Sequence, residues 1–300
     1  MDVLHAHIPK TAGTALAAVL ASWYGIGATT LPMGMAYDPV LLERELRHFP
    51  WLRALSGHGL QPWSLPPSDD GPLWIVLLRE PIARFVSDAR HQADHWRLPN
   101  GPDDYLATLA HHDRQCRFIA GDPDAQAALQ ILRHPRVLVG LQHRMTETLL
   151  MLRQALGKTD RGLHAGHRAN AASSRFQASI DQWQQERAKE IAAANVADTE
   201  LLAAAESELF EEQLEQFDRS RMEEELTRVE SESRAPSSLQ LRLQRGLVLQ
   251  QRRFLVDPYI TARRTARGLP YGPREPGRNG LRAKLTRAPG QWIGRADLSD

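Results

Sequence analysis

The chain has 300 residues, 42% of them apolar and 24% charged, with a formal net charge of +1. This composition allows a sizeable hydrophobic core that needs no covalent cross-links. The length suits one large domain or one domain with an appendage. The single cysteine, Cys116, excludes an intramolecular disulfide and fits a reducing compartment.

The chain offers no apolar run near the roughly twenty residues that a bilayer span needs. A strand is predicted to begin at residue 3, so we expect no cleavable signal and a cytoplasmic location. Charge is uneven, because residues 234–300 hold 14 Lys and Arg against 4 Asp and Glu, whereas the preceding residues hold 23 and 32. The basic segment could contact nucleic acid, lipid, an anionic polymer or, at least as readily, the acidic body of the protein.

The chain opens with a short apolar run over residues 3–8, which predicts a buried strand. A loop of small and polar residues follows over residues 9–14, and a helix is predicted from Ala15 onward. A strand, a Gly/Thr loop and a helix start bring backbone N–H groups and the helix dipole to one point, with Lys10 at the mouth. This pattern indicates a phosphate or sulfate site, although a plain strand–turn–helix explains it too. It is not a Walker loop, because Lys10 precedes Gly13.

Further elements alternate along the chain. A loop is predicted over residues 25–39, a helix over 39–49, a short strand ending near His58, and a loop over 61–72. The unbroken apolar run 73–78 predicts a central parallel strand, and Pro81 begins a helix that extends to about His95. A loop at 98–104, two short helices, a strand at 136–141 and a helix at 146–156 complete the pattern. We therefore expect an α/β fold with a mainly parallel sheet.

The C-terminal part differs from this alternation. Residues 157–174 are predicted to form a polar loop, and residues 176–228 are predicted to be almost entirely helical. Residues 231–238 are predicted to be a linker, followed by a short helix at 239–254 and an irregular basic tail. We accordingly divide the chain into a domain at 1–232 and an extension at 233–300.

Chemically matched groups follow three of the predicted strands: Lys10 with its loop, His58, and Arg79 with Ser87. A guanidinium and a hydroxyl near a helix start indicate a second phosphate site. An NTPase would place an acidic, magnesium-organising residue at the end of strand 73–78. Arg79 stands there instead, which argues against a kinase.

These stretches resemble a family. HIPKTAGTA is similar to the 5′-phosphosulfate loop, and LLREPIARFVS to the 3′-phosphate motif, of sulfotransferases that use 3′-phosphoadenosine 5′-phosphosulfate, in particular the carbohydrate enzymes of the heparan/dermatan 2-O-sulfotransferase type. Residues 56–58, 137–141 with the following helix, and 195–202 agree with the same pattern. The resemblance covers roughly residues 2–215 and implies a P-loop-like three-layer fold in a bacterial protein without the membrane anchor of the animal enzymes. The basic tail has no counterpart in the family.

The resemblance implies specific roles. His58 would take the proton of an acceptor hydroxyl, and Lys10 would neutralise the leaving 5′-phosphate, with no metal. The donor would be held by residues of both motifs and of the 157–174 loop: Lys10, Thr11, Ala12, Gly13, Thr14, Ala15, Arg79, Ser87, Arg168 and Ser173. The acceptor would be a saccharide or another hydroxyl compound, anionic if basic residues line its site, and no nucleic-acid partner is expected. Departures are Asp88 and Ala89 after Ser87, where the family often has an aromatic residue.

Other polar residues permit two interpretations each. His5 and His7 are interpreted as packing or sheet-face residues. His91 and His95 have the spacing of a metal pair, but an exposed helix face or a contact with the acceptor fits better because the sequence offers no third ligand nearby. A last group of polar residues could either contact the acceptor or lie on the solvated surface, and the sequence favours neither interpretation. These residues are Arg90, Arg97, His111, His112, Arg114, Gln115 and Arg117.

Two other functions stay open from the sequence. One is an atypical kinase of nucleosides or small molecules, which a magnesium requirement would support. The other is a non-catalytic nucleotide- or glycan-binding module, which would keep its function after replacement of Lys10 and His58. The sequence does not predict the acceptor or the oligomeric state.

Overall fold

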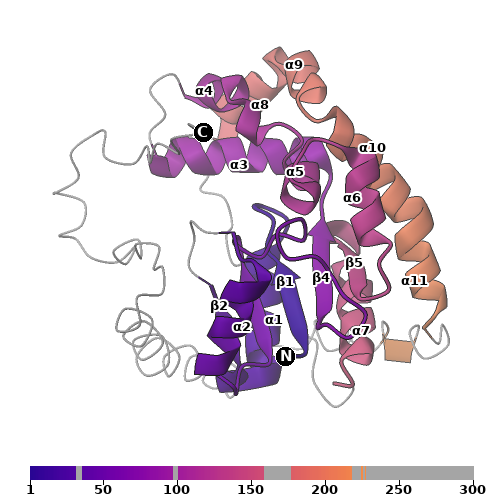
Figure 1. Cartoon of the computed structure of the whole chain (residues 1–300). Helices are drawn as coiled ribbons and strands as arrows, with labels where there is room; N and C mark the ends of the chain where they lie inside the picture. Colours follow the sequence, from indigo (N-terminus) through magenta and orange to yellow (C-terminus); the bar gives the residue numbers. More distant parts are fainter. Residues whose placement is uncertain (32–35, 97–100, 159–176, 218–223, 226, 228–300) are drawn as a thin grey trace, which may run out of the picture.

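The protein is built on a five-stranded sheet in which every neighbouring pair of strands is parallel, in the order β2-β3-β1-β4-β5 (Figure 1). The structure is a computed structural model that describes residues 1–31, 36–96, 101–158, 177–217, 224–225 and 227. The strands are β1 Val3–Ala6, β2 Ala28–Thr30, β3 Ala54–Gly57, β4 Leu73–Leu78 and β5 Val137–Leu141. The prediction of an α/β fold with a parallel sheet is confirmed.

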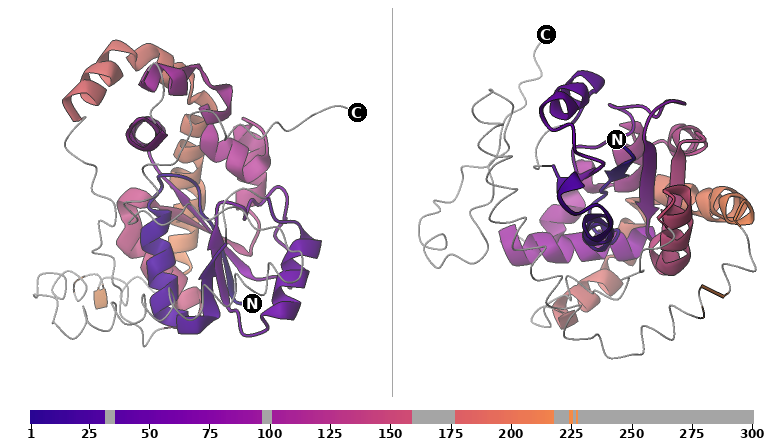
Figure 2. Two further views of the ribbon diagram at one scale, coloured as in Figure 1. Left: turned by 90° about the vertical axis from the view of Figure 1, so that its left-hand side faces the viewer. Right: turned by 90° about the horizontal axis from the view of Figure 1, so that it is seen from below.

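Helices cover both faces of the sheet and make the fold a three-layer one of P-loop-like type (Figure 2). The connection from β1 to β2 runs outward along the sheet, whereas the connection from β2 to β3 runs back. Because parallel crossovers are right-handed, helices α1 and α2 fall on opposite faces. The helices are α1 Gly13–Tyr24, α2 Pro39–His48, α3 Pro81–Trp96, α4 Pro102–Ala107, α5 Arg114–Ala120, α6 Ala125–Leu132, α7 Met145–Ala155, α8 Gln177–Glu186, α9 Ala188–Ala193, α10 Val196–Ala204 and α11 Glu211–Glu215.

Short helical turns join these elements: η1 Gly25–Gly27, η2 Leu109–His111 and η3 Gln142–Arg144, with a π-helical stretch η5 Ala205–Phe210 between α10 and α11. Helix starts follow the expected chemistry. The Asp38 carboxylate accepts a hydrogen bond from Leu41 N at 2.7 Å before α2, where Pro39 is the first helical residue. None of the described helices combines the length and the apolar character needed to cross a membrane.

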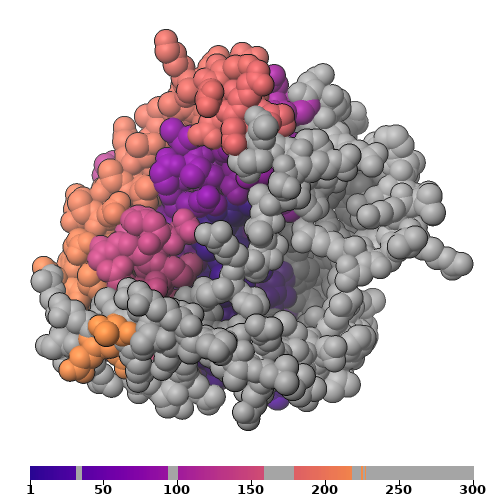
Figure 3. All heavy atoms as spheres, turned by 180° about the vertical axis from the view of Figure 1, so that it is seen from behind, coloured from indigo at the N-terminus to yellow at the C-terminus, as the bar shows by residue number. Residues whose placement is uncertain are grey.

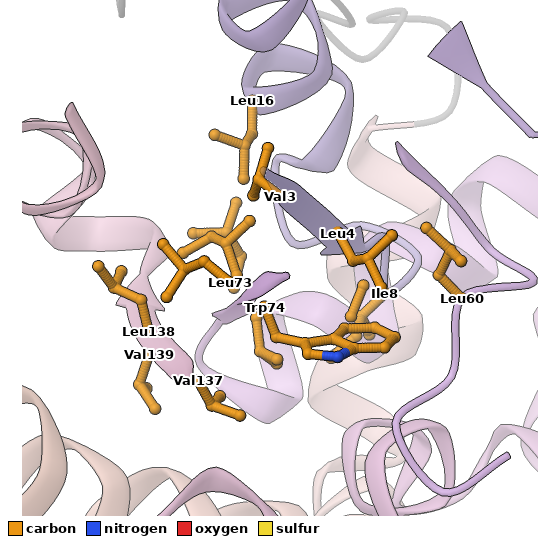
Figure 4. Packing of buried hydrophobic residues seen from close by; sticks show 14 of the residues in the cluster. Val3, Leu4, Ile8, Leu16, Leu60, Leu73, Trp74, Val137, Leu138 and Val139 are labelled. Carbon is orange, nitrogen blue, oxygen red and sulfur yellow. The ribbon is translucent and has the colours of Figure 1, made fainter. Parts of the chain in front are cut away.

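The main core lies on the two faces of the sheet. In register, Val3 pairs with Leu73 and Leu4 with Trp74, so side chains alternate between the faces (Figure 4). Leu16 of α1 packs on the side of Val3, and Trp74 lies on the opposite side with Leu4. All four strand residues of β1 and all six of β4 are buried. These two strands therefore form the rigid centre from which the site loops leave.

A second, smaller core is separate from the main one and centres on α3. It joins α3 to α4, α8 and α9 through buried side chains: Phe85, Val86, Ala89, Tyr105, Ile180, Trp183, Ile191 and Ala194. Figure 1 shows these helices beyond the end at which β4 leaves the sheet. This helical group thus faces the loops that follow the strands.

The edge strand β5 is covered by a side chain from the C-terminal helices. Gln213 of α11 accepts a hydrogen bond from Val139 N at 2.9 Å and donates one to Val137 O at 2.8 Å. Viewed from behind, the salmon and orange atoms after residue 177 form one continuous side of the molecule (Figure 3). This cover blunts an edge that would otherwise present unpaired backbone groups.

Several boundaries differ from the sequence prediction. Strand β2 lies within the predicted loop 25–39, and its three residues are too few to show an apolar pattern. Strand β1 ends at Ala6 rather than at residue 8, and α1 begins at Gly13 rather than at Ala15. Helix α4 begins inside the predicted loop 98–104. The predicted linker, the helix at 239–254, the basic tail and the boundary at 232 lie outside the described residues.

Candidate active site

The loop after β1 has an unusual backbone. Lys10 (φ 67°) and Ala12 (φ 68°) adopt the left-handed conformation, which costs a non-glycine residue about 1–3 kcal/mol. The N–H groups of Ala15 and Leu16 donate to Ala12 O, so α1 starts directly after the turn. Ala12 provides no side-chain cap. The N–H groups of Gly13 and Thr14 precede those of Ala15 and Leu16 in the first turn of α1 and are the candidate backbone donors for an anion.

Threonine hydroxyls take different positions in this loop. The Thr11 side chain is buried and donates to Ile8 O at 3.0 Å, so it braces the turn. Thr14, in the first turn of α1, is exposed. Of the two predicted hydroxyl donors, Thr14 is therefore the one whose side chain faces solvent.

Arg79 joins the end of β4 to this loop. Its guanidinium Nη1 donates to Lys10 O at 2.9 Å, which holds the left-handed residue in place. Burial lowers the pKa of Arg79, and an arginine of lowered pKa is still charged at neutral pH. The structure thus brings Arg79 into direct contact with the first motif, whereas the sequence indicates a second site separate from the first.

The start of α3 is occupied by a carboxylate of the chain itself. Glu80 accepts hydrogen bonds from Ile82 N at 3.0 Å and Ala83 N at 2.5 Å. A second anion site beside Arg79 therefore depends on side chains rather than on the amides of this helix. Ser87 lies further along α3 and is half-buried.

His58 follows β3 and is held by the backbone of the loop after β1. Its Nδ1 lies 2.5 Å from His7 O. Because a carbonyl can only accept, Nδ1 carries the proton and Nε2 carries the lone pair when the ring is neutral. Burial lowers the pKa of His58, and the hydrogen bond to His7 opposes that shift. The ring is consequently a neutral base at neutral pH.

Two further imidazoles continue from His58 into the sheet. The His7 ring lies 4.3 Å from the His58 ring between centroids, and the His5 ring stacks on His7 at 5.2 Å. His5 is buried, with its Nδ1 2.8 Å from Ser56 Oγ. Burial, followed by the charge of His58, lowers the pKa of His7 to about 3, and burial holds the pKa of His5 well below its usual value. His5 packs as predicted, whereas His7 contacts the candidate base.

A buried charge network joins α3 to α4 and α10. The guanidinium of Arg84 is fully buried, 3.7 Å from the Asp88 carboxylate and 4.0 Å from that of Asp198. Tyr105 donates to Asp88 at 2.8 Å, and its ring stacks on His111 at 3.9 Å. No local sequence pattern indicates this network, because its members belong to three separate segments.

Arg114 and Asp88 both act on His58 electrostatically. The positive charge of Arg114 lowers the pKa of His58, and the negative charge of Asp88 raises it. Arg114 is half-buried, and burial lowers its own pKa. Arg114, one of the basic residues considered for an acceptor, therefore affects the pKa of the candidate base through its charge, whereas Arg97 lies outside the described residues.

Other predicted site residues lie elsewhere. Gln115, considered for acceptor binding, is buried and hydrogen-bonded to the backbone of Arg79. Arg168 and Ser173 lie outside the described residues, as does the side chain of His95. Within the described ranges, no group of three or more His, Cys, Asp and Glu side chains is arranged to hold a metal ion.

The chain is similar to a solved sulfotransferase from Alicyclobacillus acidocaldarius, with 12% sequence identity and a TM-score of 0.35 over 64% of this chain and 94% of the other. No family model matches the chain, and no curated protein does. No function is inferred from a similarity of this identity and TM-score.

Proposed function

We propose that the protein is a sulfotransferase that moves a sulfuryl group from 3′-phosphoadenosine 5′-phosphosulfate to a hydroxyl group of a saccharide or related acceptor. The supporting observation is the hydrogen bond from Arg79 Nη1 to Lys10 O. It makes two separate anion-binding elements neighbours: the amide-rich loop before α1 and the guanidinium after β4. A donor with phosphate groups at both ends of its ribose needs two such elements.

The proposed roles follow from this arrangement. The N–H groups at residues 12–14 bind the 5′-phosphosulfate, and the Lys10 ammonium stabilises the charge that develops on the departing 5′-phosphate. Arg79 and Ser87 bind the 3′-phosphate. The acceptor hydroxyl oxygen forms a bond to sulfur while the bond from sulfur to the bridging phosphate oxygen breaks.

His58 is the proposed base. Its Nε2 takes the proton of the acceptor hydroxyl as the new bond to sulfur forms, and its Nδ1–H keeps the bond to His7 O. The half-buried Arg114 favours an acceptor that carries a carboxylate or sulfate near the reacting hydroxyl, because its charge acts at the position of His58.

The direct test is calorimetric titration with 3′-phosphoadenosine 5′-phosphate, ATP and AMP, each with and without magnesium. Micromolar affinity for the bisphosphate without magnesium supports the proposal. In Arg79→Ala this affinity should fall about 10- to 100-fold, the loss expected for one charge-assisted contact. Preference for ATP with magnesium would replace the proposal with a kinase. Unchanged ligand binding in Lys10→Ala and His58→Ala, together with no sulfuryl transfer by the wild type, would indicate a binding module.

A further inference from the structure

Gln115 gives the backbone of Arg79 the hydrogen bonds that a neighbouring strand would give. Its Oε1 accepts from Arg79 N at 2.9 Å, and its Nε2 donates to Arg79 O at 3.0 Å. The Gln115 side chain lies at the start of α5 and is fully buried. One amide group thus satisfies both backbone groups of a single residue.

Gln115 makes these hydrogen bonds just past the ends of the strands that flank β4. Strand β1 ends at Ala6, opposite Val76, and β5 ends at Leu141, opposite Leu78. Arg79 is therefore the first residue of its segment beyond the register of both neighbouring strands. The two hydrogen bonds with Gln115 extend the backbone pairing of the β4 segment by one residue, to Arg79. They hold the Arg79 backbone in place, and the backbone in turn directs the Arg79 side chain.

Gln115 is itself fixed from a second direction. The buried Asp198 carboxylate of α10 accepts from Gln115 N at 3.0 Å and from Cys116 N at 2.8 Å. The same carboxylate faces the buried guanidinium of Arg84. A continuous series of contacts consequently runs from α10 through Gln115 and Arg79 to the Lys10 carbonyl.

We propose that Gln115 is a positioning residue of the donor site. It fixes the Arg79 backbone so that the guanidinium reaches both Lys10 O and the donor's 3′-phosphate, without contacting the donor itself. The inference rests on the proposed function for the identity of the ligand. The alternative is that Gln115 merely satisfies buried backbone groups and contributes to stability alone.

The chain contains a matched control. Gln213 makes the same pair of amide hydrogen bonds to the backbone of β5, at Val139 N and Val137 O, along the edge of the sheet and not after a strand end. Gln115→Met and Gln213→Met each remove two hydrogen bonds while keeping a side chain of similar length. A purely structural role predicts that both variants lose stability and keep their affinity for ligands, with the larger loss for the buried Gln115 than for the half-buried Gln213. A positioning role predicts a loss of affinity in Gln115→Met alone.

The experiment measures the affinity of the full chain and its variants for 3′-phosphoadenosine 5′-phosphate and for AMP, with thermal unfolding in parallel. We expect Gln115→Met to weaken bisphosphate binding about 10-fold or more, and AMP binding far less, since misplaced binding groups lose affinity steeply. Gln213→Met should change both affinities less than about twofold. In an Arg79→Ala background the effect of Gln115→Met should largely disappear. If Gln115→Met does not fold, Gln115→Asn, which keeps the amide but is too short to make both bonds, takes its place.

Amide hydrogen exchange separates this inference from the proposed function. Peptides that cover residues 6–16 and 77–82 should exchange their amide hydrogens faster in Gln115→Met than in wild type. In Gln213→Met the exchange rates of these peptides should equal those of the wild type. Both expectations hold whichever ligand the protein binds. Absence of bisphosphate binding by the wild type overturns the proposed function. Equal exchange and equal affinities in wild type and Gln115→Met, or equal losses in both glutamine variants, overturn the positioning role.

Discussion

The His7 ring packs directly against the Cα atom of Gly13, so that a Cβ atom at Gly13 would lie 2.0 Å from His7 Cδ2. The same ring contacts His58, and the His7 carbonyl holds His58 Nδ1. Glycine at the start of α1 is therefore required by the close approach of an imidazole. The helix start and the candidate base are linked through one residue.

The first prediction concerns this contact. Gly13→Ala should lower the free energy of unfolding by about 1–3 kcal/mol, because the added methyl group forces the His7 ring to move. Urea unfolding of Gly13→Ala, His7→Ala and the double variant measures the coupling. In the His7→Ala background the cost of Gly13→Ala should shrink to a few tenths of a kcal/mol. Additive costs would show that the ring does not limit residue 13.

The second prediction concerns the pH dependence of transfer. Because the pKa of His58 is lowered, its lone pair stays available below pH 6.5, and the acid limb of kcat/KM should lie below that value. In Arg114→Gln the loss of a nearby positive charge makes protonation easier, so the acid limb should move to higher pH. Measurement needs an acceptor that supports turnover. ¹³C-labelled histidine titrated by NMR gives the same comparison without one, and an unmoved His58 resonance would contradict the prediction.

The third prediction concerns stability in acid. The folded protein keeps His7 neutral down to about pH 3, whereas the unfolded chain takes up a proton near pH 6.5. Stability is therefore fully present above pH 6.5 and is lost as pH falls toward 3. Each such histidine contributes a slope of up to about 1.4 kcal/mol per pH unit within that window. Denaturant unfolding between pH 4 and 8 should show a shallower slope in His7→Gln, and an identical slope would refute this assignment.

The fourth prediction concerns the carboxylate behind the site. Asp198→Ala leaves the buried Arg84 with one fewer carboxylate and frees the N–H groups of Gln115 and Cys116, so it should cost about 3 kcal/mol or more. Asp198→Asn, which keeps one acceptor, should cost less. Chemical unfolding checks both. A cost under 1 kcal/mol for the alanine variant would mean that Asp88 alone compensates Arg84.

Elements with a local signal could be predicted from the amino-acid sequence. The unbroken apolar run at residues 73–78 predicted β4, Pro81 predicted the start of α3, and the alternation of strands and helices predicted a parallel sheet. These predictions hold because a fully buried strand and a proline at a helix start impose their own residue types. The placement of Lys10, His58 and Arg79 after strands also follows from the chain order alone.

Which of these residues contact one another depends on the tertiary structure. His7 and His58 are 51 residues apart, and Arg79 and Gln115 are 36 apart, so no local pattern connects them. Their contacts follow from the strand order, which puts β1 between β3 and β4, and from the return of α5 and α10 to the end of β4. Long crossover connections set that order, and their packing against the sheet is a property of the whole chain rather than of any one segment.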